Sequence, residues 1–427
     1  MTLDSILKQI DPIISDSLDL ALSGKEISTQ RGVELFEAKG LEMRMVLTVA
    51  DELRKRAVGK RVSYVVNRNI NFTNVCIKRC GFCAFSRDFR QEEGYLLPIG
   101  EILRRATEAW KLGATEICIQ AGLPPKMDGF LYIDICRAIK KEIPDIHIHA
   151  FSPEEVLYGA TRSEMSVDEY LKSLKEAGVG SLPGTAAEIL DQTLRNLISP
   201  GRISASDWIK VIRAAHSLGI PTTSTIMYGH VETSLQKVKH IEILREIQES
   251  THGFTEFVPL SFIHTEAPMY RTIKKNSTDE NTTPVVRPGP SGDEVLKMHA
   301  VARIMLSGLI NNIQVSWVKE GPRMSQLLLD AGANDLGGTL MNESISTAAG
   351  AQYGQLMKPK YLHSIIKEIG RTPVERTTLY RVVKAFDQEG SDSSSALDEI
   401  NPSEFGSYHE LIKLDQFRYR TQRHSSM

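Results

Sequence analysis

Residues 69–85 have the sequence NINFTNVCIKRCGFCAF. Cys76, Cys80 and Cys83 stand there in the spacing C-x3-C-x2-C, directly after an apolar run that has the character of a strand. The whole chain has five cysteines in 427 residues, too few for a disulfide scaffold. The clustering of three of them therefore indicates soft-metal chemistry in a reducing compartment.

Two other interpretations of the three cysteines are weaker. The spacing i, i+4, i+7 is also one face of a helix, but this segment is basic, rich in turn residues and interrupted by a glycine. A structural zinc site needs a fourth close ligand, and none follows at a suitable spacing. An iron–sulfur cluster normally uses four thiolates, so three leave one iron of a 4Fe–4S cluster open. S-adenosylmethionine can bind that iron through its amino and carboxylate groups, and an electron can then break its C5′–S bond to give a carbon radical.

The sequence around residues 69–85 indicates a barrel. From about residue 60, short β-rich runs alternate with amphipathic stretches of helical period. The predicted strands are Ser63–Phe72, Glu116–Gly122, Ile146–Phe151, Gly180–Pro183, Thr222–Gly229, Glu256–Leu260, Asn312–Trp317 and Asp335–Met341. The predicted helices include Ile99–Leu112, Tyr132–Glu142, Val167–Ala177, Ala205–Leu218, Leu235–Glu249 and Gly292–Leu309. This alternation predicts an α/β chain with a (β/α)8 TIM-type barrel.

The barrel is predicted to span residues 59–345, between an N-terminal helical segment at 1–58 and a C-terminal extension at 346–427. Residues 271–292 are rich in Lys, Asn, Thr, Pro and Gly and are predicted to form a long loop. A serine-rich composition predicts a flexible stretch near 389–400.

Polar residues gather at the predicted carboxyl ends of the strands, where the active sites of barrels lie. Gln120 and Gly122 follow the second strand. His147 and His149 share one face of the third strand, and His149 is predicted to point into the barrel. An inward imidazole can contact a substrate or move a proton, although a lone core histidine is usually structural. Glu188 follows the fourth strand, where it either binds a cofactor or begins a helix with a favourable charge.

Composition narrows the class of protein. With 51 basic and 53 acidic residues the net charge is −2, without the basic excess that a nucleic-acid binder needs. No apolar run reaches the ~18 residues of a membrane span, and residues 1–5 lack the character of a secretory signal. We therefore expect a cytoplasmic protein that binds neither nucleic acid nor membrane. Cys118 and Cys136 stand alone among apolar residues and are predicted to be buried and dispensable.

The cysteine motif, with the aromatic Phe82 directly before the third cysteine, resembles that of the radical S-adenosylmethionine (radical SAM) superfamily. Ala121 departs from the superfamily pattern, since a second glycine is common there. Other stretches resemble the deazaflavin and futalosine branch, and within it the tyrosine-using subunit of FO synthase; they are residues 67–76, 147–153, 181–190, 222–233 and 332–341.

The resemblance implies cofactors, a reaction and partners. The resemblance implies Cys76, Cys80 and Cys83 as ligands of a 4Fe–4S cluster and Phe82, Gln120 and Gly122 as neighbours of S-adenosylmethionine. From its place after the fourth strand, Glu188 is expected on the S-adenosylmethionine side, and the inward His149 is the catalytic candidate. The implied reaction joins the 4-hydroxybenzyl fragment of L-tyrosine to 5-amino-6-(D-ribitylamino)uracil. The implied partners are the second radical enzyme of FO synthase and an electron donor such as ferredoxin or flavodoxin.

Two alternatives stay open at this point. Aminofutalosine synthase and the cyclic futalosine enzyme of menaquinone biosynthesis share the cluster and the barrel, so only their substrates separate them from the tyrosine-using enzyme. A non-enzymatic iron–sulfur or zinc-binding protein would instead have every metal fully ligated by protein, with no room for S-adenosylmethionine.

Overall fold

The computed structural model describes residues 10–276, 285–387 and 395–422. The strands are β1 (Arg61–Val65), β2 (Asn67–Ile70), β3 (Glu116–Ile119), β4 (His147–His149), β5 (Val179–Ser181), β6 (Thr222–Tyr228), β7 (Phe254–Ser261), β8 (Asp335–Gly338), β9 (Thr372–Arg376) and β10 (Val382–Ala385). The helices before β6 are α2 (Pro12–Leu22), α3 (Thr29–Glu37), α4 (Gly40–Val58), α5 (Ile99–Lys111), α6 (Leu131–Glu142), α7 (Pro153–Arg162), α8 (Val167–Glu176), α9 (Gln192–Ile198) and α10 (Ala205–Ser217). Those after it are α11 (Ser234–Thr251), α12 (Pro268–Asn276), α13 (Gly292–Met305), α14 (Trp317–Leu329), α15 (Ile345–Ala348), α16 (Pro359–Glu368), α17 (Ala396–Glu399), η1 (Pro402–Phe405), α18 (Tyr408–Leu411), η2 (Asp415–Phe417) and α19 (Tyr419–Gln422).

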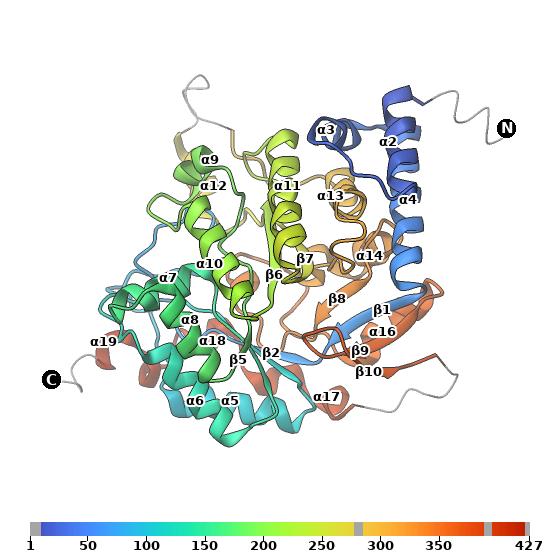
Figure 1. Cartoon of the computed structure of the whole chain (residues 1–427). Coiled ribbons are helices and arrows are strands. Elements are labelled where there is room, and N and C mark those ends of the chain that lie inside the picture. Colours follow the sequence, from blue (N-terminus) through green and yellow to red (C-terminus); the bar gives the residue numbers. More distant parts are fainter. Residues whose placement is uncertain (1–9, 277–284, 388–394, 423–427) are drawn as a thin grey trace.

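The parallel strands close into a barrel, as the alternating pattern predicted (Figure 1). β2 pairs with β3, β3 with β4, and β4 with β5. A bridge from Leu182 to Thr222 leads on to β6, which pairs with β7. Ile313 and Gln314 then bridge β7 to β8, and β8 pairs with β1 to complete the circuit.

The first barrel position consists of two short strands where the sequence predicted one. β1 ends at Val65 and β2 begins at Asn67, because the partner changes between them. The Thr339 hydroxyl accepts the Asn67 amide at 3.0 Å, and the Asn67 side chain accepts the amide of Leu340 at 2.9 Å. Gly338 leaves room for that side chain, since a Cβ there would lie 2.1 Å from the Asn67 Oδ1.

Several other predicted elements need correction. The run predicted as a strand at Asn312–Trp317 forms only two bridges, and its last residue begins α14. Helices α7, α9 and α14 lie in the barrel region and were not predicted. The predicted loop at 271–292 is wrong for its first residues, which continue α12 to Asn276, whereas α13 begins at Gly292, where a helix was predicted. Residues 277–284 lie outside the described part of the chain.

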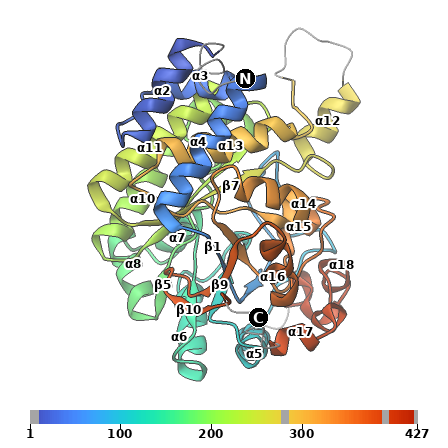
Figure 2. The same cartoon turned by 90° about the vertical axis from the view of Figure 1, so that its right-hand side faces the viewer.

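The described segments before and after the barrel both pack against it. The N-terminal helices lie at one side, where α3 contacts α11 and α4 contacts α13 (Figures 1 and 2). At the C-terminal end, β9 runs parallel to β1 and pairs with it, and β10 pairs antiparallel with β9. In the stretch predicted to be flexible near 389–400, residues up to 394 lie outside the described part, and Ala396–Glu399 form α17.

In the described residues, no helix is both long and apolar enough to cross a membrane.

Candidate active site

A cavity of about 390 Å³ lies inside the barrel and reaches the carboxyl ends of its strands. Its wall includes residues that follow β2, β3, β4, β5, β7 and β8, residues of β6 itself, and Ser316 at the seventh barrel position. The volume is within the range of small-molecule sites, which are typically about 300–1,000 Å³. The position matches that of active sites in other barrels.

Cys76, Cys80 and Cys83 all line this cavity as free thiols in the loop after β2. The loop is held by backbone hydrogen bonds, from the Cys76 amide to the carbonyl of Arg87 at 3.0 Å and from the Gly81 amide to the carbonyl of Ile198 at 2.8 Å. Burial raises the pKa of the Cys80 thiol to about 12 and also raises that of Cys83. Soft metals bind thiolates and displace such protons, so the three sulfurs fit a metal cluster by their chemistry.

Polar atoms without partners also face this end of the cavity. The Oδ1 atoms of Asn69 and Asn71, which line it, accept no hydrogen bond from the described residues. A buried acceptor without a partner is costly and indicates a donor supplied from elsewhere, such as a bound ligand or water. No three His, Cys, Asp or Glu side chains converge on a single metal ion within the described ranges.

Arg202 connects the thiols with two carboxylates. Its Nη1 lies 3.5 Å from the Cys80 sulfur and 2.8 Å from Glu188 Oε1, and its Nε lies 3.5 Å from Glu154 Oε2. The guanidinium also lies over the ring of Phe82, 5.5 Å from the ring centroid. Phe82 and Glu188 thus lie beside Cys80 in one charged cluster, and Arg202 was missed because its loop, after α9, is far from the motif in sequence.

Glu188 does not begin a helix, so the second interpretation of this residue is wrong. α9 begins only at Gln192, and Glu188 has a left-handed backbone with φ of 41° in the preceding turn. Its backbone carbonyl accepts the amide of Met227 at 2.8 Å, which ties the turn to the end of β6. The side chain is therefore directed to Arg202 at the cavity wall, where it is 8% exposed.

Gln120 and Gly122 lie between the cysteine loop and the turn after β5. The Gln120 side chain accepts from the Thr185 hydroxyl at 2.7 Å, and its backbone carbonyl accepts from the Asn71 side chain at 2.7 Å. The Gly122 amide donates to the carbonyl of Thr73 at 2.8 Å. A Cβ on Gly122 would lie 2.4 Å from the carbonyl oxygen of Val75, so only glycine allows this close approach.

His149 is buried at the cavity wall, as the alternation in its strand predicted. Its Nδ1 lies 2.7 Å from the hydroxyl of Ser181, and the Nε2 of His147 lies 2.7 Å from the same oxygen. A hydroxyl has one proton, so one imidazole accepts from Ser181 while the other donates to it. Burial lowers the pKa of His149, although the nearby Glu116 opposes this, so the ring is neutral at neutral pH.

The floor of the cavity is formed by the C-terminal hairpin. Arg376, at the end of β9, makes a bidentate pair with Asp335, at 2.6 and 2.9 Å, and lies 3.6 Å from Glu256. The ring of Tyr380 stacks on the guanidinium, 3.9 Å from its carbon, and its hydroxyl donates to Glu256. Burial raises the pKa of Glu256 to about 7, although Arg376 opposes the shift. The Thr378 side chain also lines the floor.

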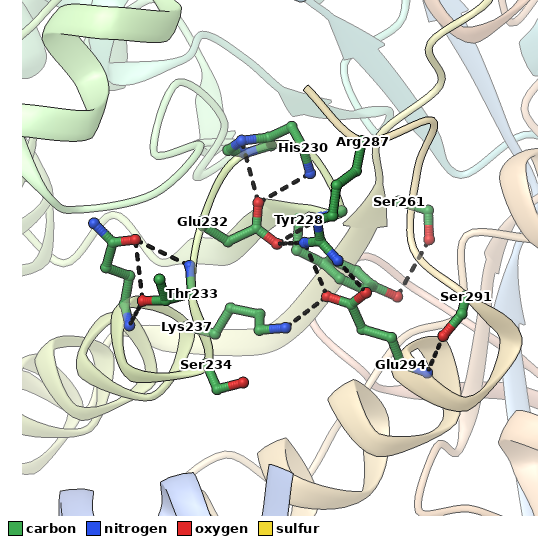
Figure 3. Close-up of polar contacts among 12 residues, drawn as sticks. Tyr228, His230, Glu232, Thr233, Ser234, Lys237, Ser261, Arg287, Ser291 and Glu294 are labelled. Atoms are coloured by element: carbon green, nitrogen blue, oxygen red, sulfur yellow. Dashed lines mark hydrogen bonds and ion pairs between the residues drawn. The ribbon is translucent and has the colours of Figure 1, made fainter. Parts of the chain in front are cut away.

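Beside the cavity, a polar network joins the end of β6 to α11 and α13 (Figure 3). Arg287 pairs with Glu232 at 2.7 Å and with Glu294 at 2.6 Å. Lys237 adds a second cation at 2.5 Å from Glu294. His230 is neutral in this geometry, because its Nδ1 accepts the amide of Val231 at 2.8 Å and its Nε2 donates to a carbonyl. The network supports the wall at Met227.

The two cysteines outside the motif differ from each other. Cys136 is fully buried in α6, as predicted. Cys118 lines the cavity and lies 3.5 Å from the Gln120 side-chain nitrogen, so the prediction of simple burial in apolar surroundings is wrong for it. The reason is its place on β3, where alternation turns it into the barrel together with Glu116 and Gln120.

Comparison with family models and solved structures agrees with this geometry. Residues 70–243 match the model of the radical SAM superfamily, and residues 251–388 match that of the CofH/MqnC C-terminal region. The methylornithine synthase PylB superimposes with a TM-score of 0.63 at 17% identity, covering 84% of this chain and 97% of that one. The hydrogenase maturase HydG gives 0.65 at 15% identity, covering 100% and 96%. At identities this low, the two superpositions show similarity of the fold alone.

Curated relatives are much more similar in sequence. The 5-amino-6-(D-ribitylamino)uracil–L-tyrosine 4-hydroxyphenyl transferase of Methanothermobacter thermautotrophicus is 47% identical, over 84% of this chain and 95% of that protein. Its counterpart in Methanocaldococcus jannaschii is 49% identical, over 84% and 98%. The FO synthase of Mycobacterium tuberculosis is 45% identical over 82% of this chain but only 40% of its own length. The chain therefore belongs to the radical SAM superfamily and, within it, to the family of the 5-amino-6-(D-ribitylamino)uracil–L-tyrosine 4-hydroxyphenyl transferases.

Proposed function

We propose that this chain transfers the 4-hydroxybenzyl fragment of L-tyrosine to 5-amino-6-(D-ribitylamino)uracil, a step toward a deazaflavin. The observation that carries the proposal is identity of 46–49% to three transferases of that name over 95–98% of their lengths. The barrel cavity with three thiols at its wall supports it, because this arrangement suits radical chemistry on a small substrate.

We assign the three cysteines to a 4Fe–4S cluster and the neighbouring residues to S-adenosylmethionine. When bound, the cluster and S-adenosylmethionine supply a carbon radical by reductive cleavage. Arg202 balances the negative charge that thiolates bring to a buried site, since it lies 3.5 Å from the Cys80 sulfur. Gln120, Gly122, Phe82 and Glu188, all in the wall around the thiols, are assigned to contacts with S-adenosylmethionine.

The remaining wall is assigned to the substrates. His149 presents a neutral imidazole to the cavity and is held by Ser181, so it can donate or accept one proton near a substrate. The barrel strands and the C-terminal floor enclose the cavity laterally and from below. This enclosure limits the access of water to the cavity, and a radical intermediate requires such exclusion of water.

Partners and location belong to the same proposal. The intermediate passes to a second radical enzyme, consistent with an FO synthase of which this chain matches only 40%. An external donor, such as a ferredoxin or flavodoxin, supplies the electron. A set of free thiols in a chain without disulfides favours the cytoplasm.

The test is turnover by the anaerobically reconstituted protein with dithionite and S-adenosylmethionine. Given L-tyrosine and 5-amino-6-(D-ribitylamino)uracil together, it should form the coupled product and 5′-deoxyadenosine, and omission of tyrosine should abolish the coupled product. Activity on futalosine-type substrates alone would refute the proposal in favour of the menaquinone enzymes. A spectrum unchanged by S-adenosylmethionine, with no turnover, would favour a non-enzymatic metalloprotein.

A further inference from the structure

Four Lys or Arg side chains line the cavity in the described part of the chain, and three of them have acidic partners. Lys78 lies 3.1 Å from Glu154, and Arg202 and Arg376 make the ion pairs given above. The fourth is Lys319, in the first turn of α14 after the seventh barrel position. Among the described residues, no carboxylate oxygen lies within 4.0 Å of its Nζ, and no hydrogen bond engages its ammonium.

Three carboxylates, Glu343, Glu320 and Glu188, act electrostatically on Lys319, and each is engaged by another group. Glu343 accepts the Asn69 side chain at 2.6 Å and the amide of Ser346 at 2.5 Å. Glu320 accepts the hydroxyl of Ser261, which also contacts Tyr228 (Figure 3). Burial lowers the pKa of Lys319, whereas Glu343, Glu320 and Glu188 act at longer range to raise it. The cavity thus contains a cation whose three donors have no acceptor among the residues that the structure describes.

An ammonium in this position selects an anionic ligand. A partly buried cation without a partner is costly, and a carboxylate that reaches it gains a charge-assisted hydrogen bond. Of the two proposed substrates, only the amino acid has a carboxylate, because the ribityl-uracil offers neutral hydroxyl and ring-amide groups. The carboxylate of S-adenosylmethionine belongs near the thiols, and it is Arg202, not Lys319, that interacts electrostatically with Cys80 and Cys83.

We propose that Lys319 binds the carboxylate of the amino-acid substrate and thereby fixes the end of tyrosine opposite its phenol. This inference rests on the proposed function and adds a binding residue to it. The position of Lys319, after the seventh barrel position, places that carboxylate on a different part of the wall from His149, which is the last residue of the third barrel strand, β4.

The experiment compares two competitive inhibitors that each retain half of the zwitterion. 3-(4-Hydroxyphenyl)propionate keeps the carboxylate and lacks the amine, whereas tyramine keeps the amine and lacks the carboxylate. Their inhibition constants against tyrosine turnover are measured for the wild type, Lys319→Gln and Lys319→Arg. The matched control is Lys297→Gln, because Lys297 is also partly buried with a pKa lowered by burial but lies outside the cavity, near the carbonyl of Ala38.

In Lys319→Gln, the KM for tyrosine and the inhibition constant of the propionate should rise about ten- to hundredfold, the effect of losing one charged hydrogen bond. The inhibition constant of tyramine and the KM for S-adenosylmethionine should not change. Lys319→Arg should retain most of the propionate affinity, and Lys297→Gln should behave like the wild type.

Three results would overturn the inference: equal weakening of both inhibitors, a rise in the KM for S-adenosylmethionine in place of that for tyrosine, or no change. If Lys319→Gln fails to retain its iron, the inhibition constants of the wild type decide the question. The inference requires that the wild type bind the propionate more tightly than tyramine, and the opposite order would overturn it. Failure of the proposed function itself is distinct, since the wild type would then form no coupled uracil product from tyrosine.

Discussion

Replacement of Gly122 by alanine should displace the cysteine loop. The added Cβ would lie 2.4 Å from the Val75 carbonyl oxygen and 2.8 Å from its carbonyl carbon, whereas ordinary contacts begin at 3.4 Å. Val75 directly precedes Cys76, so this backbone must move by about 1 Å to relieve the overlap. The loop cannot move freely, because the Gly122 amide donates to Thr73 and the next carbonyl, of Leu123, accepts the amide of Ile77. These bonds bracket the first cysteine.

The expected cost has two parts. Overpacking against backbone atoms costs about 1–3 kcal/mol in the free energy of unfolding. A displacement of about 1 Å at a catalytic group lowers the rate about a hundredfold. We therefore expect Gly122→Ala to fold, to bind less iron per chain than the wild type, and to form 5′-deoxyadenosine at about one-hundredth of the wild-type rate per bound cluster.

The assay measures iron and sulfide per chain after anaerobic reconstitution, followed by 5′-deoxyadenosine formation. Gly100→Ala is the matched control, because Gly100 lies in α5 and a Cβ there meets no atom within 4 Å. Alanine at that exposed helical position should be neutral or stabilising. Equal iron content and equal rates in the two variants would refute the packing argument.

Three further predictions follow from the site and its floor. Cys80→Ala should lose the cluster and Cys136→Ala should keep it, since only the former removes a ligand; iron analysis measures both, and wild-type iron in Cys80→Ala would exclude that residue as a ligand. His149→Gln should reduce the coupled product far more than 5′-deoxyadenosine, and an unchanged ratio of the two would remove His149 from the candidates. Arg376→Met should lower the free energy of unfolding by about 3–5 kcal/mol in chemical denaturation, because it leaves the fully buried Asp335 unpaired; a loss below about 1 kcal/mol would contradict this.

The barrel could be predicted because its signal is local. Each strand is a short β-rich run and each helix an amphipathic stretch, so alternation alone indicated the architecture. Helix α7 also has a local signal in the sequence, since Ser152 and Glu155 form a capping box around Pro153. The sequence does not show that the seventh barrel position forms bridges in place of a full strand, because the predicted strand continues through Ser316 and Trp317. In the folded protein α14 begins at Trp317, whose indole donates to the carbonyl of Gly338.

Residues of the candidate site could be predicted from the sequence only where they belong to a motif or to a strand with an alternating pattern. The three cysteines share one motif, and His149 alternates with apolar residues in one strand, so both were found. Arg202 and Lys319 have no such marker. They lie 122 and 239 residues beyond Cys80, and only the folded barrel brings them to the same cavity. Arg376 was missed for the same reason, since its importance depends on a carboxylate contributed by β8.

The hairpin that supplies the cavity floor has a consequence for synthesis of the protein. A ribosome makes about 5–20 residues per second, and 293 residues separate Cys83 from Arg376. The cysteine loop therefore emerges about 15–60 s before the guanidinium that neutralises Asp335 is made. For most of that interval the barrel also lacks β8, because Asp335 is made only 41 residues before Arg376, and the hairpin that forms the floor comes last. Until the hairpin is made, the three thiols are not enclosed by the finished cavity and depend on the surrounding reductants for protection.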